Sequence, residues 1–154
     1  METAKQVSIF LENKPGRLAN VLSALAKEKV NVTALTVMDS REHNVMRVVT
    51  NDGTKTVQVL KGMGIPFAET EVLLVDLKNQ PGALAHVCEV LAGDHINIDY
   101  CYASSGGRNG QVYGIFKVSN TDRAKQLLGG SGTNNKRAER RPLRDKRSYS
   151  GPPR

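Results

Sequence analysis

Periods of hydrophobic and polar residues typical of strand, helix, strand, strand and helix occur twice in succession along the chain. The first round predicts strands over 7–11, 32–38, 45–50 and 66–71. Between them it predicts two helices, one with the apolar stripe Leu18, Val21, Leu22 and Leu25 and a second that begins at 52–54. The second round predicts strands over 72–77, 96–103 and 112–118, helices over 83–92 and 121–128, and hairpin turns in both rounds, at 39–44 and 106–110.

The two rounds also share residues. Residues 11–21 recur 66 positions later as 77–87, with Asn-x-Pro-Gly in both, and Val-Asn-Val at 30–32 recurs as Ile-Asn-Ile at 96–98. A repeat of this length predicts two copies of one small domain. We place the first copy at 6–71, the second copy at 72–130, and a basic tail at 131–154, which we expect to be disordered.

The order of elements predicts an α+β fold, in which each copy is a ferredoxin-like βαββαβ sandwich with an antiparallel sheet and its helices on one face. The second copy departs from this order because the residues after Leu128 are rich in glycine and polar side chains, so it lacks its last strand. Strand 72–77 should then be open along one edge, or be covered by a strand from the other copy or another chain.

The second strand of each copy is apolar on both faces, although this fold places it at a sheet edge. We therefore predict that strands 32–38 and 96–103 pair with the edge of another copy, within or between chains, and form a seam. Tyr100 and Tyr102 share a face of the later strand. Packing in the seam is the favoured role for these tyrosines, and contact with a ligand is the alternative.

Asn-x-Pro-Gly stands where a strand gives way to a helix. Proline donates no hydrogen bond and glycine has no side chain, so the backbone N–H groups at 16–18 and 82–84 should be accessible. These donors and the helix dipole favour an anion such as a carboxylate, and the amides of Asn13 and Asn79 can both donate and accept. A turn with only a structural role is the alternative interpretation.

The Asn-Lys-Pro-Gly-Arg-Leu and Asn-Gln-Pro-Gly-Ala-Leu segments, followed by Val-Asn-Val and Ile-Asn-Ile-Asp-Tyr-Cys-Tyr, resemble the ACT domain family over residues 6–130. The resemblance implies βαββαβ domains that associate through their second strands and bind small molecules, most often amino acids, at the seam. It further implies that each turn receives the ligand backbone and that the second-strand starts line the pocket from the same or a neighbouring copy. The implied site residues are Asn13, Gly16, Arg17, Leu18, Asn31, Val32, Asn79, Gly82, Ala83, Leu84, Asn97 and Ile98.

The formal charge of +7 is concentrated in the tail, which has eight Lys or Arg and two acidic residues and carries +6, leaving +1 for residues 1–130. Nucleic-acid binding through the tail is therefore a weaker hypothesis than a solvated extension. No run of eighteen apolar residues predicts a membrane span, and Cys88 and Cys101 are expected to be free thiols in the cytoplasm.

No nucleophile with a base or pair of carboxylates predicts catalysis, and neither histidine nor cysteine spacing predicts a metal; no cofactor is expected. The leading hypothesis is a non-catalytic regulatory protein that binds an amino acid between ACT-like domains, as a homodimer or higher oligomer. The alternative is a regulatory subunit that contacts a catalytic chain of amino-acid biosynthesis.

Overall fold

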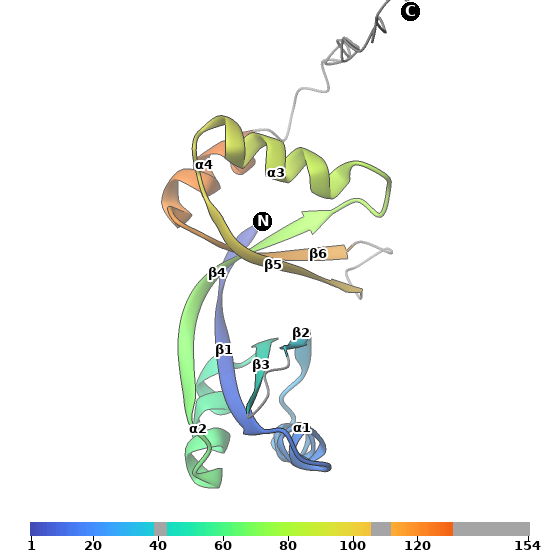
Figure 1. The fold of residues 1–154 in the computed structure, drawn as a ribbon, viewed down its shortest axis with the longest axis vertical. Helices are drawn as coiled ribbons and strands as arrows, with labels where there is room; N and C mark the ends of the chain where they lie inside the picture. Colours follow the sequence, from blue (N-terminus) through green and yellow to red (C-terminus); the bar gives the residue numbers. More distant parts are fainter. Residues whose placement is uncertain (39–42, 106–111, 131–154) are drawn as a thin grey trace, which may run out of the picture.

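Two long strands, β1 (Glu2–Glu12) and β4 (Phe67–Leu77), pair along the centre of a six-stranded antiparallel sheet in the computed structural model (Figure 1). The structure describes residues 1–38, 43–105 and 112–130. Residues 39–42 of the turn predicted at 39–44, the turn predicted at 106–110 and the tail at 131–154 lie outside this part, and residues 43 and 44 begin a strand instead. The sheet order is β2 (Val32–Met38), β3 (His43–Thr50), β1, β4, β6 (Val112–Val118) and β5 (Ile98–Ser105).

Four helices in the described part cover the sheet in pairs: α1 (Arg17–Lys27) with α2 (Gly53–Met63), and α3 (Ala83–Gly93) with α4 (Thr121–Gly130). Figure 1 shows the helical pairs at opposite ends of the molecule, with the two halves of the sheet facing each other between them. Each helical pair buries its own apolar core against the strands, centred on Leu25 and Leu60 in one half and on Leu91 and Phe116 in the other. A third cluster, which includes Val49, Val72 and Ile115, lies between the halves.

Each copy completes its sheet with part of the other copy's long strand. Residues 67–71 of β4 lie beside β1 as the last strand of the first copy, and Glu2, Thr3 and Ala4 of β1 pair with Leu74, Leu73 and Val72 as the last strand of the second. The predicted α+β, ferredoxin-like fold is confirmed. The strand absent after α4 is supplied by the first copy, one of the alternatives that the sequence left open.

The β1–β4 ladder is symmetric about the pair of Lys5 and Glu71. Thr3 pairs with Leu73 on one side of this pair, and Val7 pairs with Glu69 on the other. Thr3 and Glu69 are repeat equivalents, as are Val7 and Leu73, so a half-turn about the ladder's centre exchanges the copies. The duplication in sequence is thus a pseudo-two-fold axis in the structure.

The prediction that the second strands pair edge to edge is wrong within the chain, although they meet across the seam, where the Ser104 hydroxyl donates to the Thr33 carbonyl (2.8 Å). The copies are joined by β1 and β4, whereas β2 and β5 lie at the two edges of the sheet. The sequence does not predict this strand pairing because residues 2–5 lack the apolar alternation of a half-buried strand. The apolar residues that pack against them come from β4 and β6. Pairing of an edge strand with another chain stays a prediction.

A buried polar network connects the facing halves of the sheet. Gln6 is fully buried; its amide nitrogen donates to the hydroxyl of Tyr100 (2.8 Å), and its amide oxygen accepts from Tyr102 (3.0 Å). The guanidinium carbon of Arg47 lies 4.0 Å from the centre of the Tyr100 ring. The two tyrosines therefore occupy the seam between the copies, as their position on one face of the strand predicted.

Candidate functional site

The two Asn-x-Pro-Gly turns have the same backbone geometry. Gly16 has φ 84° and ψ −16°, and Gly82 has φ 85° and ψ −11°, in the left-handed region that favours glycine. The N–H of Lys14 donates to the Glu12 carbonyl, and the equivalent bond joins Gln80 to Lys78, both at 2.8 Å. The repeat therefore preserves a specific turn as well as a sequence.

The helices that follow these turns begin without a side-chain cap. In α1 and α3 the first i to i−4 bonds come from Asn20 N–H to the Gly16 carbonyl and from His86 N–H to the Gly82 carbonyl, both at 2.9 Å, and no side chain accepts from the preceding N–H groups. The other two helices are capped: an oxygen of Asp52 accepts from the N–H of residue 55, and an oxygen of Asn120 from that of residue 123. Among the described helices, α1 and α3 are thus the two that begin without a side-chain cap, although the N–H groups of Arg17 and Ala83 donate to the carbonyls of Lys14 and Gln80 at 3.4 and 3.3 Å.

The turn residues are exposed, and they include apolar side chains. Leu18 and Leu84, in the first turn of each helix, are 37% and 43% exposed. Asn13 accepts a hydrogen bond on its side-chain oxygen from the amide of Asn44 on β3 (3.2 Å), which leaves its own amide hydrogens directed elsewhere. Both turns are thus open to a ligand or a partner, and a leucine in each one contributes an apolar surface.

Charged side chains surround the first turn. One carboxylate oxygen of Glu12 accepts from the guanidinium of Arg17 (2.9 Å) and from the ammonium of Lys14 (3.0 Å). Hydrogen bonds from Lys14 and Arg17 hold the pKa of the Glu12 carboxyl below its ordinary value. Glu12 is therefore ionised at neutral pH, and the group of three carries one surplus positive charge.

The second turn lacks this arrangement. Lys78, Gln80 and Ala83 occupy the positions equivalent to Glu12, Lys14 and Arg17. This turn keeps the backbone donors and Leu84, but it has no acidic partner at the position of Glu12. The two sites are alike in backbone and different in charge.

A cavity of about 280 Å³ lies beside the first turn, between the end of β1, the start of α1 and the end of α2. Phe10 and Met63, which line it, are 41% and 38% exposed. Glu12 and Arg17 are its charged lining residues. The cavity thus combines an ion pair with exposed apolar side chains.

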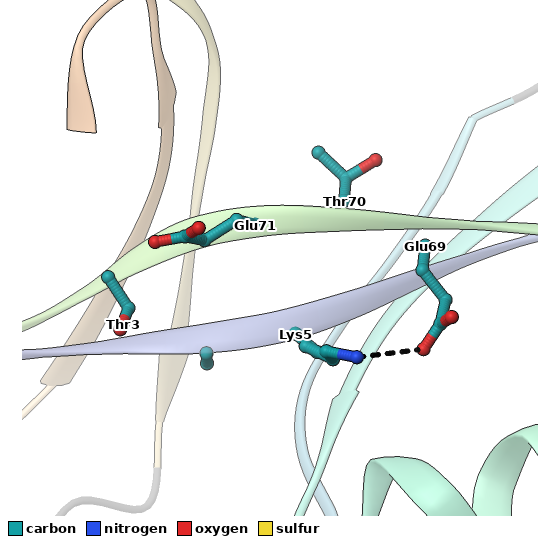
Figure 2. Close-up of a pocket in the computed structure, with 6 residues that line it drawn as sticks. Thr3, Lys5, Glu69, Thr70 and Glu71 are labelled. Carbon is teal, nitrogen blue, oxygen red and sulfur yellow. Dashed lines mark ion pairs between the residues drawn. The ribbon is translucent and has the colours of Figure 1, made fainter.

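A second cavity, of about 370 Å³, lies over the centre of the β1–β4 ladder and contains none of the predicted site residues. Figure 2 shows Lys5 directed toward Glu69, with 3.7 Å between the ammonium nitrogen and a carboxylate oxygen, and Thr3, Thr70 and Glu71 nearby. The Lys5 and Glu69 side chains are exposed, so their ion pair contributes little to stability. This cavity marks the pseudo-two-fold axis and is not the motif's site.

Asn31 and Asn97 lie away from the turns of their own copies. Asn31 exchanges hydrogen bonds with Asn51, through its N–H to a side-chain oxygen (2.8 Å) and its carbonyl to an N–H (3.1 Å). Asn97 does the same with Ser119, at 3.1 and 3.0 Å. The strand register places Val32 opposite Thr50, whereas the first turn follows the opposite end of β3, where Glu12 pairs with His43.

The second-strand starts therefore lie at the other end of the sheet from the turn of their own copy, and their contribution to a ligand pocket, from the same or a neighbouring copy, stays a prediction. The hydrogen bonds and ion pairs that the described residues form at the turns also stay within their own copy. The seam inside the chain is formed instead by Gln6, Tyr100 and Tyr102. A ligand site at a seam, within or between chains, stays a prediction.

Sequence reasoning missed several residues beside the first turn. The spacing of opposite charges at Glu12, Lys14 and Arg17 could have indicated the ion pair. The approach of Met63 and Pro66 to Phe10 could not have been found, because it depends on where α2 ends against β1; the Phe10 N–H donates to the Pro66 carbonyl at 3.0 Å.

In the described ranges 1–38, 43–105 and 112–130, no three His, Cys, Asp or Glu side chains are grouped so as to hold a metal ion. Both cysteines are free. No helix in the same ranges has the length and apolar character needed to span a bilayer.

The chain is thus a tandem of two ferredoxin-like domains that share their central strands and have the same strand-to-helix turn. The ACT domain pair family matches residues 2–131, and the chain belongs to that family. This membership supports a regulatory, ligand-binding role. No curated protein matches the chain.

Solved structures share the fold. Protein BT0572 from Bacteroides thetaiotaomicron is 34% identical, with a TM-score of 0.76 over 83% of this chain and 88% of that chain. The regulatory subunit of aspartate kinase from Thermus thermophilus, in a ligand-free form, is 15% identical, with a TM-score of 0.63 over 86% and 95%. The corresponding subunit from Thermus flavus is 17% identical, with a TM-score of 0.56 over 84% and 90%. The Thermus proteins are similar in fold.

Proposed function

We propose that the chain is a non-catalytic regulatory protein of the cytoplasm that binds an amino acid at its Asn-x-Pro-Gly turns. The observation that carries the proposal is the contrast among helix starts: α1 and α3 expose uncapped N–H groups, whereas α2 and α4 have side-chain caps. Uncapped donors at a helix start, with the positive end of its dipole, attract a carboxylate. Membership of the ACT domain pair family supports the same role.

We further propose that the functional unit is a homodimer in which β2 of one chain pairs with β2 of another. Edge strand β2 carries Val37 and Met38, which are 42% and 48% exposed. Met38 pairs with Val45, and Val45 pairs with Phe10. The end of β2 therefore lies at the same end of the sheet as the first turn. A partner along β2 would place a seam beside that turn, and its ligand would favour the dimer by binding it better than the monomer.

Light scattering coupled to gel filtration tests the dimer. The parent chain should elute as a dimer, and Val37→Lys, which places a charge on the edge, should elute as a monomer. Lys78→Glu, an exposed change in the second copy, is the matched control and should remain dimeric. A monomeric parent in the presence of ligand would contradict the proposed assembly.

Thermal unfolding with each of the twenty amino acids tests the function. A ligand at 100 times its Kd stabilises the folded state by about 2.7 kcal/mol, so one or more amino acids should raise the melting temperature by several degrees. Gly16→Ala and Gly82→Ala together should abolish the response. Gly62→Ala, at an exposed helical position with open space around it, should retain it. No response to any amino acid would remove the proposal.

A further inference from the structure

We infer that the cavity beside the first turn selects an amino acid with an apolar side chain, and that the second turn lacks this selectivity. The inference rests on the proposed function and adds the ligand class and the copy that recognises it. It follows from the charges, the apolar walls and the size of the cavity, and from their absence at the equivalent positions of the second copy.

The ion pair at the cavity matches a zwitterion. One oxygen of Glu12 accepts from both Arg17 and Lys14, and the other oxygen of the same carboxylate has no hydrogen-bond or ion-pair partner among the described residues. The free oxygen can accept from a ligand ammonium group. Arg17, whose guanidinium has five N–H donors, can still bind a ligand carboxylate.

The remaining walls favour an apolar side chain. Apart from Gly64 and the polar Asn20, they consist of Phe10, Leu11, Met63, Ile65 and Pro66, of which Phe10 and Met63 are more than a third exposed. Covering apolar surface is favourable by roughly 25 cal/mol per Å². Since Glu12 and Arg17 are the charged lining residues and would be engaged by the ligand backbone, a charged ligand side chain would lose water without gaining a partner.

The size of the cavity agrees with a small ligand. At about 280 Å³ it lies just under the range of roughly 300–1,000 Å³ that drug-sized ligands occupy. The second copy has Asp76 at the position of Phe10, Lys78 at that of Glu12 and Ala83 at that of Arg17. A zwitterion would find neither the ion pair nor the aromatic wall there.

Calorimetry on the full chain tests the inference with methionine, leucine and phenylalanine against aspartate, lysine and glycine. Methionine, leucine or phenylalanine should bind at least tenfold more tightly than any of the other three. Arg17→Ala, which installs the second copy's residue, should weaken this binding at least tenfold. Lys27→Ala, which removes an exposed cation from the last turn of the same helix, is the matched control and should leave it unchanged.

Phe10→Asp tests the walls separately from the charges. It should abolish the preference for apolar side chains, and far-UV circular dichroism should confirm that the variant is folded. Preferential binding of aspartate or lysine that is weakened by Gly16→Ala would overturn the selectivity but leave the proposed function intact. Binding that survives Arg17→Ala and is lost in Gly82→Ala would assign recognition to the second copy and also overturn the inference. If none of the twenty amino acids binds, both this inference and the proposed function are wrong.

Discussion

Gly16 and Gly82 hold φ angles of 84° and 85°, and no atom lies within 4 Å of the place where a Cβ would stand. The cost of a substitution at either position is therefore conformational rather than steric. For a residue with a Cβ, the left-handed region is less favourable by roughly 1–2 kcal/mol of conformational free energy. These glycines set the direction in which α1 and α3 leave the sheet.

Gly16→Ala and Gly82→Ala should each lower the free energy of unfolding by about 1 kcal/mol, measured by urea denaturation. Gly62→Ala, inside α2 with similar open space and without a positive φ, should raise it by up to about 1 kcal/mol. Equal effects of the three alanines would show that backbone conformation is not the cause.

Gln6 is the buried polar residue on which the seam depends. Burial raises the pKa of the Tyr102 hydroxyl above its ordinary value, so Tyr102 is a neutral donor to Gln6 at neutral pH. Gln6→Leu removes the partner of both Tyr100 and Tyr102. Each hydroxyl then bears the cost of an unmade hydrogen bond.

We expect Gln6→Leu to lower the free energy of unfolding by about 2–3 kcal/mol, measured by urea denaturation. Tyr102→Phe should cost less in the Gln6→Leu background than in the parent chain, because its partner is already absent. Additive effects of the two changes would contradict a direct hydrogen bond between them.

At the scale of elements, β1 belongs to both copies. Its pairs with β3 begin at Gln6, while Glu2, Thr3 and Ala4 lie beside Val72–Leu74 of β4 and pair with no other strand. Ala4 packs against the cluster between the halves that contains Val72 and Leu74. The beginning of the chain therefore stabilises a domain whose own sequence starts about 70 residues later.

Removal of residues 2–4 tests this shared strand. Amide hydrogen exchange should become faster at Val72–Leu74, which lose the neighbouring strand β1 but keep β6, while the amides of Met46 and Val48 in β3 keep their partners and change less. Unchanged protection at Val72–Leu74 would show that the second copy does not depend on β1.

Helices α3 and α4 are joined by a bidentate ion pair. Arg123 donates to the two oxygens of Asp94 at 2.6 and 2.9 Å, and these hydrogen bonds hold the pKa of Asp94 below its ordinary value of 3.8. A lowered folded-state pKa stabilises the protein above the unfolded pKa, and that stabilisation is lost as the pH falls through the folded pKa.

In an NMR titration the Asp94 carboxyl should have its midpoint below 3.8, and Arg123→Gln should raise that midpoint. Lys125→Gln, on the same helix, is the control and should leave it unchanged. An Asp94 midpoint that does not respond to Arg123→Gln would contradict the role of the ion pair.

At the scale of the whole molecule, charge and fold are separated along the chain. Removing residues 131–154 takes the formal charge from +7 to +1 without removing any residue of the three apolar clusters. Electrostatic affinity for phosphate should therefore reside in the tail, whereas ligand binding should reside in the paired domains.

Any affinity of the full chain for a DNA duplex, measured by fluorescence anisotropy at low salt, should be absent from residues 1–130. The shortened chain should keep its thermal response to amino acids. DNA affinity that persists without the tail would show that the paired domains carry a nucleic-acid surface.

The sequence by itself determined the repeated elements, the α+β class and the two Pro-Gly turns. Each of these depends on local information: the period of apolar residues selects helix or strand, and glycine alone adopts a positive φ at no cost. The edge positions of β2 and β5 and the seam role of Tyr100 and Tyr102 also followed from the order and pattern of strands.

Tertiary structure alone decided how the copies join and what lies beside each turn. Glu2–Lys5 is a strand only because β4 runs alongside it, and neither a joint nor an axis at Lys5 and Glu71 can be found in polar residues considered alone. Met63, 53 residues farther along the chain than Phe10, lines the same cavity through the packing of α2. Contacts between residues so distant in sequence depend on packing geometry, which no local pattern encodes.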